Sequence, residues 1–345
     1  DNDDLYKIYW EDTKMEFSAT AGTAGGSLKA LFEVRDGDNL ENFKGKVTKA
    51  DSYSLTVENI SIDNIKSLNL PDKDGKITVN NISYSYDSWE AQVDAQGNIK
   101  SVTFNLSKDK AIADPEKTVA EGYLLNAGSA INARGIPYYM TQLNEFVRNF
   151  SEMFNQIESK GQNLNGDTPP TFFEAITNTA KVYDFSESEA YSKLPDGQTA
   201  TINSSSNTYY RMTAANFSVN KDVMNDVSLF ATSTDYVKTD SCDIVDELKK
   251  LQSEKTVYRG DKAESFLETI ISNVSVDTEK AETYNKLYSN LEQTIANQRT
   301  SVSGVDEDEE ALNLVKFQYS YNMASKIISV MNQMLDKLIN DTGVA

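Results

Sequence analysis

Residues 301–345, SVSGVDEDEEALNLVKFQYSYNMASKIISVMNQMLDKLINDTGVA, carry the strongest structural signal in this chain. From Leu314 onward the apolar residues recur in alternating steps of three and four, the heptad pattern of a helix that packs on other helices. Five acidic residues at 306–310 precede them, where they suit the positive end of the helix dipole. The predicted contact seam consists of Leu314, Phe317, Tyr321, Ala324, Ile328, Met331, Leu335 and Leu338.

This helix has little surface charge. Between Ala311 and Leu335 the only charged residues are Lys316 and Lys326. A helix that is apolar on several faces is not a solvated surface helix, so it either lies inside its own domain or contacts other subunits. The scarcity of charge favours other subunits. Further apolar residues flank the seam at Leu312, Val315, Tyr319, Met323, Ile327, Val330 and Met334.

The same segment resembles the C-terminal signature of the flagellar hook-associated protein 1 (FlgK) family. That signature typically reads SGV-x-x-DEE-x-x-NL-x-x-(F/Y)Q-x-x-Y and continues as a helix ending in ML-x-x-L-I. In this chain the acidic triplet, Asn313-Leu314, Phe317-Gln318 and Tyr321 fall in register with it. Other axial flagellar proteins share a looser version of the pattern.

Two earlier segments extend the resemblance. GGSLKALFEVRDG at 25–37 is similar to the family's GG-x-L-x-A-L-x-x-x-RD. It predicts a short helix capped by Ser27, with Leu28, Leu31 and Phe32 inward. A longer helix is predicted from Ile136, with Pro137 in its first turn. Its heptad positions are Tyr139, Leu143, Phe146, Phe150, Met153 and Ile157. The family's N-terminal helical segment has no counterpart here, so the resemblance implies a piece that lacks those assembly helices.

Between these helices the hydrophobic period changes to that of β-strands. Strands are predicted at 52–57, 76–86, 89–93 and 100–106, with a hairpin turn at 94–98. Asp72 to Gly75 resembles the start of a calcium loop, but the third acidic ligand and the closing glutamate are missing, which favours a tight turn.

The chain is therefore predicted to be α+β: an elongated helical bundle with heptad-patterned helices, plus inserted β-rich modules. Residues 1–45, 136–164 and 241–345 form the discontinuous bundle core, 46–135 form an inserted β-rich domain, and 165–240 form a mixed β-rich segment packed on the bundle. Helices at 262–300 and 308–340 have similar lengths, and an antiparallel hairpin is the simplest arrangement for them.

Composition excludes several function classes. The net charge is −20 over 345 residues, which argues against nucleic acid and anionic membranes as partners. The chain has no histidine and a single cysteine, Cys242, so it offers no Ser-His-Asp triad, no His-containing zinc site and no internal disulfide. The acidic residues are scattered, and no local pattern points to a catalytic pair, although two distant carboxylates could meet in the fold. We predict no enzymatic activity and no cofactor or metal site.

The resemblance implies a structural protein that joins the flagellar hook to the filament. Its partners would be the hook protein, the neighbouring hook-associated protein, copies of itself, and an export chaperone at the C-terminal helix. It would be extracellular, exported to the flagellum without a cleaved signal peptide, and this piece alone would be a monomer. The alternative is a secreted or surface binding protein, such as an adhesin or secretion tip protein, that uses the β-insertion. An exposed aromatic groove around Tyr84, Tyr86 and Trp89 would favour that alternative.

Overall fold

The computed structural model describes residues 11–12, 25–72, 75–107, 112, 115, 119, 121–177, 179–237, 241–258 and 260–341. The chain divides into two compact units, residues 1–270 and 271–345. Helices and strands are mixed along the chain, as the α+β prediction requires. Part of the calcium-like loop, at residues 73–74, lies outside the described residues.

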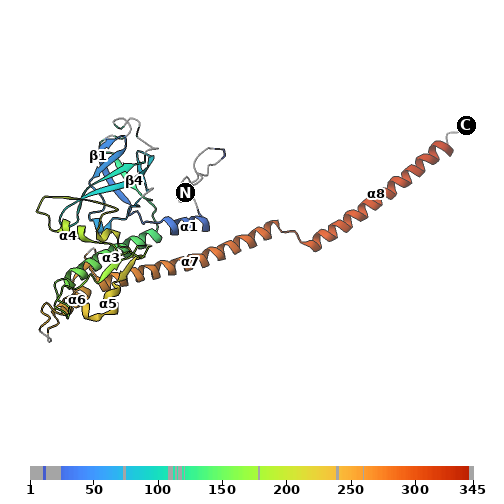
Figure 1. Cartoon of the computed structure of the whole chain (residues 1–345). Helices are drawn as coiled ribbons and strands as arrows, with labels where there is room; N and C mark the ends of the chain where they lie inside the picture. The colour runs from blue at the N-terminus through green and yellow to red at the C-terminus, as the bar shows by residue number, and fades with distance from the viewer. Residues whose placement is uncertain are drawn as a thin grey trace. The chain divides into compact units, whose positions relative to one another are not determined.

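The elements follow one another as shown in Figure 1. The helices are α1 (Ser27–Asp36), η1 (Ile65–Ser67), α3 (Ile136–Glu158), α4 (Ser186–Ser192), η3 (Tyr209–Arg211), α5 (Lys221–Asn225), η4 (Val227–Leu229), α6 (Asp243–Ser253), α7 (Ala263–Ser303) and α8 (Glu307–Asp341). The strands are β1 (Phe43–Asp51), β2 (Ser54–Glu58), β3 (Gly75–Val79), β4 (Ile82–Val93), β5 (Ile99–Leu106), β6 (Leu124–Ala127), β7 (Phe173–Ala175), β8 (Ala200–Asn203), β9 (Phe217–Val219), β10 (Thr256–Tyr258) and β11 (Asp261–Lys262).

The main sheet closes on itself. Its order is β3-β6-β1-β2-β5-β4-β8, and β3 also pairs with β4, so the ring of antiparallel pairings is complete. The long strand β4 makes this possible: residues 82–86 pair with β3, and residues 90–93 pair with β8 on the same edge. Closure removes the unpaired edges that would otherwise invite pairing with other chains.

The barrel interior is a single apolar core. Alternate residues of each strand point inward, and Leu55, Trp89 and Phe104 are fully buried there. The predicted strands and the turn at 94–98 are confirmed, with two corrections. The strand predicted at 89–93 is not separate, because β4 runs unbroken from Ile82 to Val93. The strand predicted over 76–86 is interrupted at Asn80 and Asn81, which both have positive φ (49° and 62°) and form the hairpin turn between β3 and β4. Asparagine tolerates this left-handed conformation better than most residues do.

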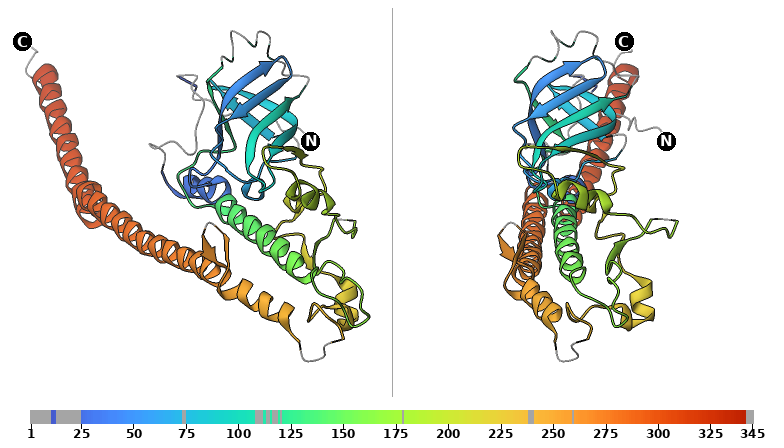
Figure 2. Two further views of the ribbon diagram at one scale, coloured as in Figure 1. Left: turned by 90° about the vertical axis from the view of Figure 1, so that its left-hand side faces the viewer. Right: turned by 60° about the vertical axis from the view of Figure 1, so that its left-hand side comes forward.

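Helix α3 lies beside the barrel and buries two chemically different faces (Figures 1 and 2). The face toward the barrel is polar. Arg148 is 2% exposed there; its Nε donates to the Met212 carbonyl at 2.8 Å, and its Nη1 donates to the carbonyls of Lys66 and Leu68 at 2.9 and 2.7 Å. Glu152 forms an ion pair with Lys66. The buried Arg148 guanidinium thus finds acceptors in main-chain carbonyls at the end of η1, as buried polar groups require.

The opposite face of α3 carries the predicted heptad residues. Phe146 and Phe150 stack at 5.6 Å between ring centroids, and Phe146 also stacks on Phe266 at 5.3 Å. Ile157 is buried in one cluster with Ile244 and Leu251 of α6 and with the start of α7. The predicted packing role is confirmed for Phe146, Phe150, Met153 and Ile157.

The chain enters and leaves the barrel through a contact between two glycines. Gly37, just after α1, accepts a hydrogen bond from the Gly135 N–H at 3.0 Å and another from the Tyr138 N–H at 3.2 Å. A Cβ on Gly135 would meet the Val34 carbonyl oxygen at 2.6 Å and the Gly37 nitrogen at 2.8 Å. Only residues without a side chain allow the two segments to approach so closely.

Helix α1 differs from its prediction in two respects. Gly26 rather than Ser27 occupies the N-cap position, and no side chain caps the helix. Leu28 and Leu31 are exposed rather than inward. The short apolar pattern of α1 indicated a helix correctly, but it did not indicate which surface covers that helix.

Glu158, at the end of α3, gives a testable pH dependence. Its side chain is buried, and burial raises the pKa to about 7. Between the ordinary glutamate pKa and this value the folded state keeps a proton that the unfolded state releases, so stability falls as pH rises through that window. We expect Glu158→Gln to match the wild type near pH 5 and to exceed its free energy of unfolding by about 2 kcal/mol near pH 8.

Urea unfolding at pH 5, 6, 7 and 8 measures this difference. Glu282→Gln, on an exposed part of α7, is the matched control and should change nothing at any pH. A Glu158→Gln difference that stayed constant across the four pH values would contradict the assignment.

Candidate assembly surface

Helix α8 begins at the acidic run that the sequence placed there. The Asp306 carboxylate accepts from the backbone N–H of Asp308 at 2.9 Å and of Glu309 at 3.3 Å, and so caps the helix. Four further acidic residues, 307–310, fill the first turn. The preceding helix α7 continues to Ser303, three residues beyond its predicted end, and residues 304–306 separate it from α8.

All eight predicted seam residues lie on α8, and all are exposed. Their three-and-four spacing places them on one face of the helix. Exposure is high even for the largest side chains, at 74% for Phe317 and 75% for Tyr321. We call these eight residues the α8 seam. A continuous apolar surface of this size marks a contact site in a soluble protein.

The predicted antiparallel hairpin of α7 and α8 is wrong for the chain by itself. Apolar side chains of α7, among them Tyr284, Tyr288 and Leu291, are exposed, as is the α8 seam. The two helices therefore do not cover one another. A heptad pattern specifies that a helix packs on something, but it does not specify which helix that partner is.

Several threonine hydroxyl groups of helix α7 are hydrogen-bonded within the helix itself. The side chains of Thr278, Thr294 and Thr300 each donate to the carbonyl four residues earlier, at 2.8, 2.8 and 3.0 Å. Such internal hydrogen bonds reduce the polarity that the helix presents to its surroundings. Residues 271–303 of α7 thus extend the apolar surface, although the α8 seam alone was predicted as the contact site.

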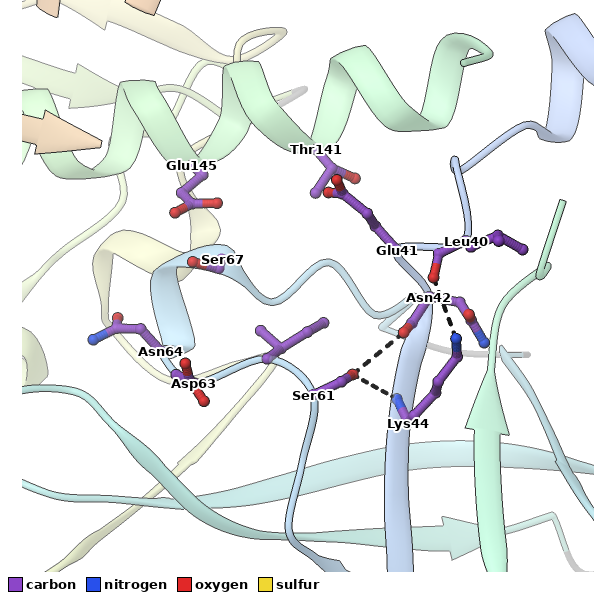
Figure 3. A pocket seen from close by; sticks show the side chains of 11 residues that line it. Leu40, Glu41, Asn42, Lys44, Ser61, Asp63, Asn64, Ser67, Thr141 and Glu145 are labelled. Atoms are coloured by element: carbon purple, nitrogen blue, oxygen red, sulfur yellow. Dashed lines mark hydrogen bonds between the residues drawn. The ribbon is translucent and has the colours of Figure 1, made fainter. Parts of the chain in front are cut away.

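A cavity lies between β1, the segment before η1, and α3 (Figure 3). It has a volume of about 520 Å³. Acidic side chains line it from three directions, at Glu41, Asp63 and Glu145, against one lysine, Lys44. Its electrostatic character is therefore negative, like that of the whole chain.

Ser61 is one of three hydroxyl side chains that line this cavity, with Ser67 and Thr141, and its hydrogen bonds are structural. Its Oγ accepts from the Lys44 backbone N–H at 3.0 Å and donates to the Asn42 carbonyl at 3.4 Å. The Lys44 ammonium donates to the Leu40 carbonyl at 3.3 Å. Because the hydroxyl proton points to a main-chain oxygen rather than to a base, this arrangement does not supply an activated nucleophile.

In the part of the chain that the structure describes, no group of three or more acidic or cysteine side chains is arranged to hold a metal ion. Nor does any helix there combine the length and apolarity that crossing a membrane requires. Cys242 is exposed and forms no disulfide.

The aromatic groove that would favour a binding module is not formed by Tyr84, Tyr86 and Trp89. Tyr84 is 6% exposed, and the other two side chains are fully buried. Trp89 packs edge-on against Tyr210 with ring centroids 5.0 Å apart. These side chains belong to the barrel core.

Comparison with known proteins places the α8 seam in a flagellar context. The family model for the C-terminal part of flagellar basal body rod FlgEFG proteins matches residues 296–341, a segment that contains the whole seam. The chain is also 21% identical over 341 residues to flagellar hook-associated protein 1 of Bacillus subtilis, a match that covers 96% of this chain and 56% of that protein. The chain thus spans about half the length of this relative. The two similarities together support a flagellar protein of the hook-associated type with a structural role.

Proposed function

We propose that this chain is part of a hook-associated protein 1 that joins the flagellar hook to the filament, and that the α8 seam makes its subunit contacts. One observation carries the proposal: an uncovered apolar heptad seam coincides with the segment that matches the flagellar family model. A joining protein without catalytic groups needs this kind of surface, because apolar burial drives protein association.

The partners follow from the same surface. The α8 seam, with exposed parts of α7, would pack on copies of the same protein, on the hook protein and on the neighbouring hook-associated protein. In that assembly the heptad helices would form the elongated bundle, and the β-rich domain would stay outside it. Before assembly, an export chaperone would cover the seam, and export would proceed without a cleaved signal peptide to the extracellular flagellum.

We expect the chain of residues 1–345 to be a monomer in solution, because one seam offers only part of the contact area that a lattice of neighbours provides. The protein would act mechanically and not as an enzyme.

The test uses the natural gene, extended upstream of residue 1, in a related strain that builds hooks but no filaments for lack of its junction protein. Electron microscopy should show a short ring at the hook tip. Replacement of Leu314, Ile328 and Leu335 by glutamate should abolish the ring, because three charges would be buried without partners in each contact.

The matched control adds three glutamates to the same helix but away from the seam, at Asn322, Ser329 and Gln333. This variant should still form the ring. A stable, exported wild-type protein that forms no ring at all would overturn the proposed junction role. If both triple variants lost the ring equally, the α8 seam would not be the contact surface.

A further inference from the structure

A second cavity has the opposite electrostatic character to the one in Figure 3. It has a volume of about 390 Å³ and lies where the segment after η1, helix α3 and the region around η3 meet. The charged side chains that line it are Arg148, Arg211 and Asp72. Two positive groups face one negative group, in a chain whose net charge is −20.

Arg148 is held rigidly at this cavity with hydrogen-bonding capacity to spare. Its side chain is 98% removed from solvent, its Nε and Nη1 reach main-chain carbonyls, and its guanidinium lies 4.5 Å from the centroid of the Tyr210 ring. No acceptor among the described residues is hydrogen-bonded to its Nη2. A buried guanidinium nitrogen at a cavity wall that lacks a protein acceptor is suited to receive one from a ligand.

Arg211 contributes a second positioned guanidinium. It stacks on the Tyr183 ring at 4.0 Å from the centroid, and its Nη1 donates to the Ser205 carbonyl at 3.3 Å. Asn216 helps to fix the backbone of Arg211, because its side-chain amide donates to the Arg211 carbonyl at 2.9 Å. Arginines backed by tyrosine rings keep a fixed orientation and present their edges, which is the geometry that binds carboxylate and phosphate oxygens.

Two carboxylates act on the Arg148 charge: Asp72 at the cavity wall and Glu145 on α3. Asp72 is exposed to water, whereas Arg148 is buried, so the arginine charge is screened less. At physiological salt, charges more than about 8 Å away are largely screened, which limits the effect of the overall negative charge. Among the side chains that line the cavity itself, positive charge exceeds negative charge by one.

We propose that this cavity binds the oxyanion of a small solute, with Arg148 and Arg211 as its two cationic partners. The site is independent of the α8 seam and of the junction role. Its volume exceeds that of an inorganic ion, so an acidic sugar such as a uronic acid is accommodated as well as free phosphate.

Trp89 provides a reporter, because it packs against Tyr210, which lines the cavity. The chain has two tryptophans, so Trp10→Phe leaves Trp89 alone. In this background the protein is titrated with sodium phosphate and with sodium glucuronate, against sodium chloride at equal ionic strength, by fluorescence and calorimetry. We expect saturable binding of at least one oxyanion beyond the chloride control. The tighter of the two identifies the group that the site takes.

Variants test the assignment of the residues. Arg211→Ala should weaken binding at least about tenfold, the loss expected for a charge-assisted hydrogen bond. Arg211→Lys keeps the positive charge but not the planar fork, so its affinity should lie between those of the wild type and Arg211→Ala. If the alanine variant does not fold, the lysine variant takes its place in the test. Arg299→Ala on exposed α7 is the control and should bind like the wild type. Absence of saturable binding, or unchanged affinity in the folded Arg211 variants, would overturn the proposal.

Discussion

Replacement of Arg148 by leucine is expected to lower the free energy of unfolding by about 4 kcal/mol. The guanidinium donates to the carbonyls of Lys66, Leu68 and Met212, and leucine would leave these oxygens without this donor at a buried contact. Those carbonyls belong to two segments that are far apart in sequence, so one side chain holds α3 to the η1 segment and to the region after η3.

Arg148→Lys distinguishes charge from geometry. Lysine keeps the positive charge but offers a single nitrogen, which cannot reach carbonyls arranged around a planar fork. In urea unfolding, we expect Arg148→Lys to recover less than half of the unfolding free energy that Arg148→Leu loses. A lysine variant as stable as the wild type would show that charge alone holds this contact and would contradict the proposed role of the fork.

Replacement of Gly135 by alanine is expected to cost about 3 kcal/mol of unfolding free energy. The new Cβ would meet the Val34 carbonyl oxygen and the Gly37 nitrogen, and these backbone atoms cannot rotate away as a side chain could. The two segments would have to separate, with loss of the hydrogen bonds to the Gly37 carbonyl.

The double variant Gly37→Ala, Gly135→Ala should cost less than the sum of the two single changes, because the first already separates the segments. Gly25→Ala is the matched control, since a Cβ there has no neighbour within 4 Å. Urea unfolding of the wild type and these four variants measures the differences. A Gly135→Ala protein that unfolds like the Gly25→Ala control would contradict the tight contact.

Much of the local structure could be read from the residues. The acidic start and heptad spacing of α8, the proline at the start of α3 and the turn at 94–98 are short-range features, and each formed where it was expected. The break at Asn80 and Asn81 was missed, because a run of alternating residues hides a two-residue turn unless glycine marks it.

The two candidate sites also differ in whether the sequence reveals them. The α8 seam is visible in the sequence because a helix repeats its contact residues every three or four positions. The cavity of Arg148 and Arg211 is not visible, because its walls come from separate segments between Asn69 and Asn216 that carry no shared pattern.

The sequence by itself therefore determined the long helices, the strands between residues 54 and 106 and the apolar seam of α8, since each depends on residues that are neighbours along the chain. Only the tertiary structure decided that β3 and β4 close the barrel, that β8 joins it from residues 200–203, and that the polar face of α3 is buried. Those outcomes depend on which distant surfaces meet. The energy of such contacts comes from the shape and hydrogen-bonding groups of both partners, and a local pattern records only one of them.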